Sequence, residues 1–259
     1  MTTGNTPLVV TPPKRRKRSD MLAARIRDLI SQRGLSPGDR IPQEWLAEEE
    51  MKASKGTVRE AMKALETQGL IKTRTGPGGG AFVTALSGEQ AMDLLSNLFL
   101  FNQPGIADIY ALRKLLEPEL AASLAGNLDE KGSAALQATI RLYENEPKTA
   151  EEEFRQRIAE LDFHSVLSSL AENQLLGFVC VFLQTLLRDL TECRAIYAEP
   201  NPQLRETALN YQVRTIRLLK AGDAEGARRL MREHMEDAER YMLERARIRS
   251  QASREADSA

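Results

Sequence analysis

The chain has only two histidines, His164 and His234, and both lie beside or inside apolar helical stripes. His164 lies four residues after Glu160, so these two side chains share one face of a helix. Two imidazoles and a carboxylate can hold zinc with a water or a ligand oxygen in the fourth position. A buried histidine is more often a hydrogen-bonded core residue, so a metal-free polar pocket is the competing interpretation.

Arg113 is the second candidate, because it lies inside an apolar helical stripe between Ile109 and Leu116. An unpaired buried charge is costly, so its guanidinium requires an anionic partner. Glu117, or an acid from another helix, is one such partner. The carboxylate of a bound ligand, held by both arms of the guanidinium, is the other.

Residues near the N-terminus indicate binding to nucleic acid. Residues 14–18 are an unbroken run of lysine and arginine, well placed to contact phosphates. Further on, Ser54 is a good N-cap for a helix with an apolar stripe from Val58 to Leu65. Small and basic residues occupy its other face, which suits a helix that enters the major groove. They are Lys55, Gly56, Thr57, Arg59 and Lys63.

The elements that must position these residues are mostly helices. Helices are expected from Ser19, from about Gln43 to Met51, and from Ser54. Strands over residues 70–74 and 81–83, joined by a glycine-rich turn, predict a β-hairpin wing. From residue 88 onward, long segments of 3.6-residue periodicity predict about seven helices. The expected fold class is therefore mostly α: a winged helix-turn-helix followed by an all-α bundle.

Charge is divided unevenly along the 259 residues. The net charge is −1, but residues 1–83 hold 15 lysines and arginines against 9 acidic residues, which leaves 21 against 28 in the remainder. A small basic domain joined to a larger acidic one indicates a module that binds a polyanion.

Several classes of protein are disfavoured. No apolar run reaches the roughly 18 residues of a transmembrane helix, and a secretory h-region is lacking. Cys180 and Cys193 show no metal-type spacing and are too few for a disulfide framework. A Ser-His-Asp or Cys-His arrangement and an HExxH motif are absent from the sequence. We therefore expect a cytoplasmic protein that is not an enzyme and has no membrane partner.

Residues 20–83 resemble the winged helix of the GntR family. The resemblance rests on residues 35–42, 54–62, 66–70 and 78–83. It implies that Lys55, Thr57 and Arg59 contact operator DNA, with Gly79 and Gly80 at the wing tip near the minor groove. One departure is Gln43-Glu44, where family members usually carry a basic residue. The expected DNA-contacting set is Arg40, Lys55, Gly56, Thr57, Arg59, Lys63, Gly79 and Gly80.

Residues 88–245 resemble the FCD ligand-binding domain of the FadR subfamily, through residues 106–118, 161–164 and 219–234. Metal-binding members use an acidic residue, a histidine four residues later and two further histidines. The matching positions here are Glu160, His164, Gln212 and His234. Glutamine is a poor ligand for transition metals, which favours the metal-free pocket. A divalent zinc or nickel ion on Glu160, His164 and His234 remains the alternative.

The leading hypothesis is a sequence-specific transcriptional regulator, a homodimeric repressor of operator DNA released by a small carboxylic acid. The effector would lie near Arg113, Glu160, His164, Gln212 and His234. Two alternative functions are a helical-bundle metal-dependent hydrolase and a non-specific architectural DNA binder. The first would not explain the wing, and the second would not explain the polar pocket. The expected divisions are a disordered basic tail (1–18), the winged helix-turn-helix (19–84), the helical effector-binding and dimerisation domain (88–248) and a disordered tail (249–259).

Overall fold

The computed structural model describes residues 17–47, 51–141, 145–199 and 202–256 of the chain. Contacts divide the chain into two compact units, the first ending at Leu95 and the second beginning at Ser96. This division falls inside helix α4 (Gly88–Leu98), later in the sequence than the linker expected near residues 86–88.

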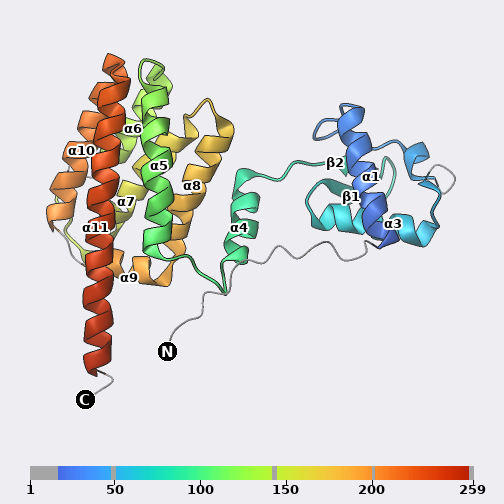
Figure 1. The fold of residues 1–259 in the computed structure, drawn as a ribbon. Coiled ribbons are helices and arrows are strands. Elements are labelled where there is room, and N and C mark those ends of the chain that lie inside the picture. Colours follow the sequence, from blue (N-terminus) through green and yellow to red (C-terminus); the bar gives the residue numbers. More distant parts are fainter. Residues whose placement is uncertain (1–16, 48–50, 142–144, 200–201, 257–259) are drawn as a thin grey trace. The chain divides into compact units, whose positions relative to one another are not determined.

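In the first unit, helices are followed by a β-hairpin (Figure 1). It contains α1 (Arg18–Gln32), the short 3-10 helix η1 (Gln43–Leu46), α3 (Lys55–Thr67), β1 (Ile71–Arg74) and β2 (Gly80–Val83). The two strands are antiparallel, with Ile71 opposite Val83 and Arg74 opposite Gly80. Ile26, Leu65 and Ile71 are buried in a core shared by α1, α3 and the hairpin. The predicted recognition helix and wing are confirmed.

The predicted second helix is interrupted in the described residues, and Met51, its expected last residue, is helical. The 3-10 turn η1 ends at Leu46, and Ala47 then has an extended backbone with φ −64° and ψ 143°. Residues 48–50 of the predicted helix lie outside the described residues, as do residues 1–16 with most of the basic run. Of that run, Lys17 caps α1 and Arg18 is its first residue.

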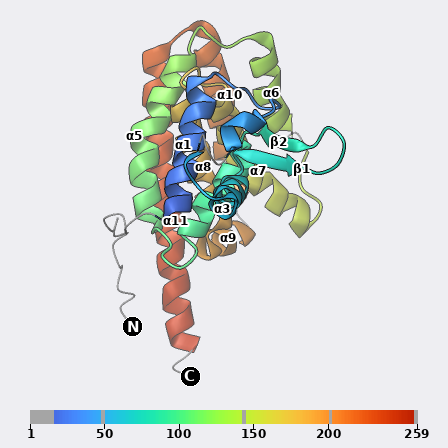
Figure 2. The ribbon, with the colours of Figure 1, turned by 90° about the vertical axis from the view of Figure 1, so that its right-hand side faces the viewer.

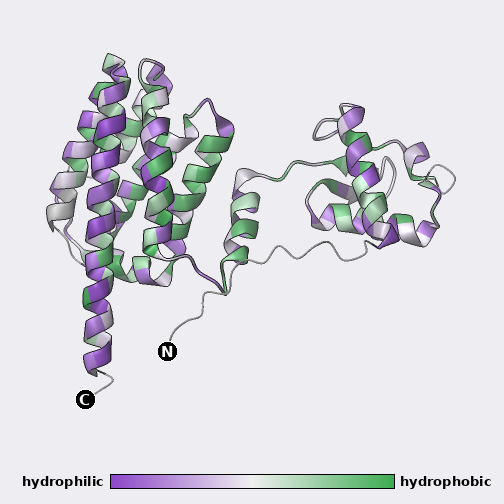
Figure 3. Ribbon diagram, viewed as in Figure 1, coloured by the Kyte–Doolittle hydropathy of each residue, from purple (hydrophilic) through white to green (hydrophobic). Residues whose placement is uncertain are grey.

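The second unit is a bundle of long helices. After α4 it comprises α5 (Ile106–Leu124), α6 (Glu130–Ile140), α7 (Ala150–Ser169), α8 (Gln174–Asp189), α9 (Thr191–Ala198), α10 (Pro202–Ala221) and α11 (Ala224–Ala256). Helices α5 and α11 run side by side in opposite directions, and α7 packs against α8 (Figures 1 and 2). Helix α8 is mostly hydrophobic along its length (Figure 3). The all-α prediction is confirmed, with eight helices from residue 88 onward in the described part.

Helix α11 corrects the expectation of a disordered tail from residue 249, because it continues to Ala256. Residues 249–256 contain neither glycine nor proline, and alanine, arginine, glutamine and glutamate all favour helix. Arg249 also forms an ion pair of 2.5 Å with Glu199. The last turns are largely hydrophilic (Figure 3).

None of the described helices is by itself both long enough and apolar enough to cross a membrane, although α8 and α9 meet that test together as a pair bent by 70°.

Candidate functional site

Helix α3 packs its apolar face against the core, so its basic face is exposed. The Ser54 hydroxyl accepts a hydrogen bond of 3.3 Å from the Thr57 backbone N–H and so caps the helix. Val58, Ala61 and Leu65 are buried. The predicted DNA-contacting side chains of Lys55, Arg59 and Lys63 are exposed, as is Gly56, whereas Thr57 is half-buried with its hydroxyl 3.1 Å from that of Ser54.

The wing depends on its glycines for structural reasons. A Cβ at Gly79 would lie 2.6 Å from the Arg74 carbonyl oxygen, so no other residue fits there without movement. Gly80 has φ +147°, a conformation that favours glycine. Arg40 donates a hydrogen bond of 2.5 Å from Nη2 to the Gly79 carbonyl oxygen. Arg40 therefore holds the turn of the wing, a role that its place in the sequence motif did not predict.

Arg113, in α5, is paired with a carboxylate of its own helix. Its Nε lies 2.5 Å from Oε1 of Glu117 and its Nη2 lies 3.2 Å from Oε2, and both residues are only 1% exposed. The internal partner is thus the interpretation that the structure supports. A further contact of the guanidinium with an effector carboxylate stays a prediction, because only Nε and Nη2 are seen to contact Glu117. Burial alone would raise the pKa of Glu117, but Arg113 and then His164 lower it overall.

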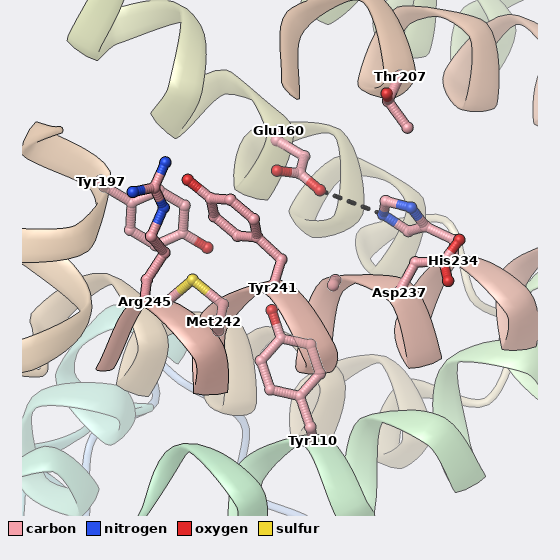
Figure 4. A pocket seen from close by; sticks show the side chains of 10 residues that line it. Tyr110, Glu160, Tyr197, Thr207, His234, Asp237, Tyr241, Met242 and Arg245 are labelled. Carbon is pink, nitrogen blue, oxygen red and sulfur yellow. Dashed lines mark ion pairs between the residues drawn. The ribbon is translucent and has the colours of Figure 1, made fainter. Parts of the chain in front are cut away.

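Three of the predicted ligands converge beside this pair. His164 Nδ1 lies 2.7 Å from Glu117 Oε2, and its Nε2 lies 3.2 Å from Nε2 of His234. The same His234 atom lies 3.2 Å from Oε1 of Glu160 (Figure 4). One donor atom from each of Glu160, His164 and His234 lies within 4.8 Å of the others. Helices α7 and α11 therefore bring together the two histidines and the acid, as the sequence predicted.

The surroundings shift the pKa values of His164 and Glu160 toward their metal-binding forms. Burial lowers the pKa of His164, although Glu117 opposes the shift. Burial would raise the pKa of Glu160, but the hydrogen bond and charge of His234 lower it overall. A neutral imidazole and an ionised carboxylate are the forms that bind a metal cation.

Gln212 is fully buried in α10. Neither its Oε1 nor its Nε2 has a hydrogen-bond partner in the described part of the chain. The preceding residue, Tyr211, stacks on the His234 ring with centroids 3.7 Å apart. Gln212 is therefore a buried amide beside the wall of the histidine cluster, and its own approach to the cluster stays a prediction.

A cavity of about 250 Å³ opens beside Glu160 and His234. Its other walls include three aromatic side chains and one arginine, which the sequence reasoning missed (Figure 4). They are Tyr110 of α5, Tyr197 of α9, and Tyr241 and Arg245 of α11. Arg245 carries a positive charge into this wall, whereas Arg113 is not among the lining residues. The helical register of α11 was the one available signal, because Tyr241 and Arg245 follow His234 at intervals of seven and eleven residues.

Two protein-family models match the chain, one in each unit. The model of the bacterial regulatory proteins of the GntR family matches residues 18–83, and the FCD domain model matches residues 108–237.

Curated relatives match this chain over most of their length. The Uxu operon transcriptional regulator of Escherichia coli K12 is 26% identical, with 86% of each chain covered. LutR of Bacillus subtilis 168 is 24% identical over 82% of this chain and 94% of its own. NanR of Edwardsiella tarda, described as a transcriptional repressor, is 24% identical over 86% and 85%. A solved GntR structure from Streptococcus agalactiae shares the fold, with a TM-score of 0.59, 19% identity and coverage of 86% and 99%.

The capped basic helix, the glycine wing and the cavity of the helical bundle thus occur in one chain in the order that the family models require. The chain belongs to the GntR family of bacterial regulatory proteins: it is a DNA-binding transcriptional regulator, not an enzyme, with a C-terminal FCD domain that binds an effector.

Proposed function

We propose that this regulator is a cytoplasmic repressor whose operator binding is controlled by a small carboxylic acid, bound next to a divalent metal on Glu160, His164 and His234. The observation that carries the proposal is the convergence of their three donor atoms beside a cavity that Glu160 and His234 line. The description of NanR as a repressor supports the sign of regulation.

The close contacts between these polar atoms favour a cation over a metal-free cluster. His164 Nδ1 lies 2.7 Å from Glu117 Oε2, and its Nε2 lies toward His234. Nε2 of His234 lies 3.2 Å both from His164 Nε2 and from Glu160 Oε1. A single ring proton serves only one of those two contacts well, whereas a divalent cation would accept lone pairs from all three atoms.

The spacing of the donors fits zinc. Zinc–nitrogen bonds of about 2.0–2.1 Å at tetrahedral angles separate neighbouring ligand atoms by about 3.3 Å. The two observed separations of 3.2 Å agree with that edge length. The buried amide of Gln212, which has no hydrogen-bond partner in the described part of the chain, follows Tyr211, which stacks on the His234 ring. With three protein ligands, a fourth position would stay open for an effector oxygen.

The Arg113–Glu117 pair would serve this site as an outer support. Histidine ligands usually donate their second ring N–H to a carboxylate, which sets the tautomer and the ring orientation. Glu117 is placed to do so for His164, and Arg113 holds Glu117 in turn. A bound cation would supply positive charge to an anionic effector, which is why we propose a carboxylic acid.

On the DNA side, we propose that Lys55, Thr57 and Arg59 contact the operator. Exposed lysine and arginine side chains at the start of a capped helix support this role. Gly56, Lys63, Arg40 and the wing glycines complete the proposed surface.

We further propose that the regulator acts as a homodimer. Specific recognition usually requires more surface than one winged helix buries. Two exposed leucines on α5, Leu112 and Leu115, at 47% and 68% exposure, support packing against a second copy. Sedimentation should give a dimer at micromolar concentration. A monomer that still binds a single half-site tightly would contradict this.

The experiment that tests the function is an anisotropy titration of the full chain with DNA that it selects from random duplexes. Lactate and glucarate, with zinc present, should weaken operator binding by roughly 5- to 150-fold, the usual range of allosteric coupling. The variant His164→Ala should bind the same DNA and lose this response. Operator affinity that neither acid changes, or a response that survives His164→Ala, would contradict the proposal.

A further inference from the structure

We propose that Arg245 is a specificity-determining residue of the effector cavity: it receives the far carboxylate of an elongated polyhydroxy diacid whose near end lies at the Glu160–His164–His234 cluster. The inference rests on the proposed function and adds the class of effector. Four features of the cavity support it.

The first feature is the line of residues along α11. Arg245 follows His234 by eleven residues, close to three full turns, so both face the same cavity. Their Cα atoms are therefore separated by about 16 Å along the helix axis. A three-carbon acid at the histidines would not reach the arginine. Side chains on a helix lean toward its N-terminus, which brings the Arg245 side chain closer to His234 than the Cα separation suggests. A six-carbon chain with an acidic group at each end spans much more of the remaining distance than a three-carbon acid does.

The second feature is the weak neutralisation of Arg245. Its nearest ion pair is with Glu199, where Nη1 and Oε2 are 3.7 Å apart. Arg249 takes the other oxygen of that carboxylate at 2.5 Å. The Arg245 guanidinium also lies 5.5 Å from the centre of the Tyr241 ring, which keeps it against the cavity wall. Glu199 is thus shared between two arginines, and Arg245 retains capacity for a second carboxylate.

The third feature is the set of tyrosine hydroxyls between the two ends. Tyr110 and Tyr197 are only 2% and 4% exposed, and Tyr241 is half-buried. Within the described ranges, none of their hydroxyls takes part in a side-chain hydrogen bond. Buried tyrosine hydroxyls usually have a partner. In Figure 4 the Tyr241 ring lies between Arg245 and Glu160, and the Tyr197 ring overlaps the Arg245 side chain in that view. Hydroxyl groups along the effector chain would match these phenols.

The fourth feature is size. A volume of about 250 Å³ lies just below the usual range of about 300–1,000 Å³ for small-molecule pockets. This is room for one small molecule. Taken together, the charges at both ends and the polar middle select a hydroxylated diacid over a short monoacid.

The test is calorimetry of the zinc-loaded full chain with three acids: lactate, gluconate and glucarate. Wild type should bind glucarate more tightly than gluconate, and gluconate more tightly than lactate. Arg245→Gln should weaken glucarate binding by about 10- to 100-fold, the usual effect of removing a charged hydrogen-bond partner, and lactate binding by less than about threefold. Arg249→Gln is the matched control, because it removes a second arginine from the same helix and the same carboxylate partner but not from the cavity wall.

Equal weakening of lactate and glucarate in Arg245→Gln, or no weakening of glucarate, would overturn the assignment. Equal losses in Arg249→Gln would also overturn it, because the effect would then belong to the contact with Glu199. Circular dichroism of each variant shows whether the fold is kept, and Arg245→Lys provides a second variant that retains the charge. A zinc titration without acid reports on the metal cluster separately, so failure of the proposed metal site and failure of the Arg245 assignment are distinguishable.

Discussion

Replacing Arg113 by methionine should destabilise the C-terminal unit more than any exposed arginine substitution. The change removes two hydrogen bonds of 2.5 and 3.2 Å to Glu117 and leaves that carboxylate at 1% exposure without its cation. Breaking a buried pair by removing one partner usually costs about 3–5 kcal/mol. For a unit of this size, that loss corresponds to a melting temperature lower by about 6–20 °C.

Urea denaturation separates this effect from the rest of the chain. The single tryptophan, Trp45, lies in the first unit, so its fluorescence reports on the unfolding of that unit, whereas circular dichroism follows the bundle. The tryptophan transition should not move. A matched control is Lys114→Met, which removes the partly exposed pair with Glu239 and should cost less than about 1 kcal/mol.

A second variant tests the cause. Adding Glu117→Gln to Arg113→Met removes the stranded charge and keeps an oxygen that can accept from His164, so the double variant should recover about 1–3 kcal/mol. A cost below about 1 kcal/mol for Arg113→Met, or no recovery in the double variant, would refute the reasoning that the pair is a buried charge and its counter-ion.

Three further predictions concern the DNA surface and the cluster. Arg59→Ala should weaken operator binding in anisotropy titrations by about 1–3 kcal/mol, whereas Arg33→Ala, exposed after α1, should not; equal effects would remove Arg59 from the base-reading face. Gly79→Ala places a Cβ 2.6 Å from the Arg74 carbonyl oxygen and should lower operator affinity without unfolding the first unit, while Gly88→Ala, with nothing within 4 Å, should be neutral. Gln212→His should raise zinc affinity in calorimetry by supplying a third imidazole, and an unchanged affinity would place residue 212 outside the cluster.

The recognition helix could be predicted because local signals decide it. Ser54 supplies the cap, and Val58, Ala61 and Leu65 supply an apolar stripe that has only one way to be buried. The pairing of Glu160 with His164 on one face follows from the same periodicity. The interruption of the second helix could not be predicted, because Ala47 adopts an extended backbone that its residue type does not require.

The partner of Arg113 could not be decided from spacing alone. An arginine and a glutamate four residues apart pair as readily on an exposed face as in a core. Burial of Glu117 becomes clear only when α7 brings His164 to its second oxygen. The resemblance to effector-binding proteins favoured a ligand carboxylate, whereas Nε and Nη2 of the guanidinium contact Glu117 within the helix.

The cavity walls were beyond sequence reasoning for a different reason. Tyr110, Tyr197 and Arg245 come from three helices, and only tertiary packing places them around one space. Arg245 stands in a segment rich in charges, where only its spacing of eleven residues from His234 sets it apart from the arginines around it.

The most direct test of the metal-centred account is calorimetric titration of zinc into the chelator-treated full chain. We predict one zinc per chain in the wild type, with binding lost in Glu160→Gln and retained in Asp162→Asn, a matched removal of an acid from the same helix whose carboxylate instead pairs with Arg188. Absence of zinc binding by the folded wild type, or equal binding by Glu160→Gln, would contradict a metal site on Glu160, His164 and His234.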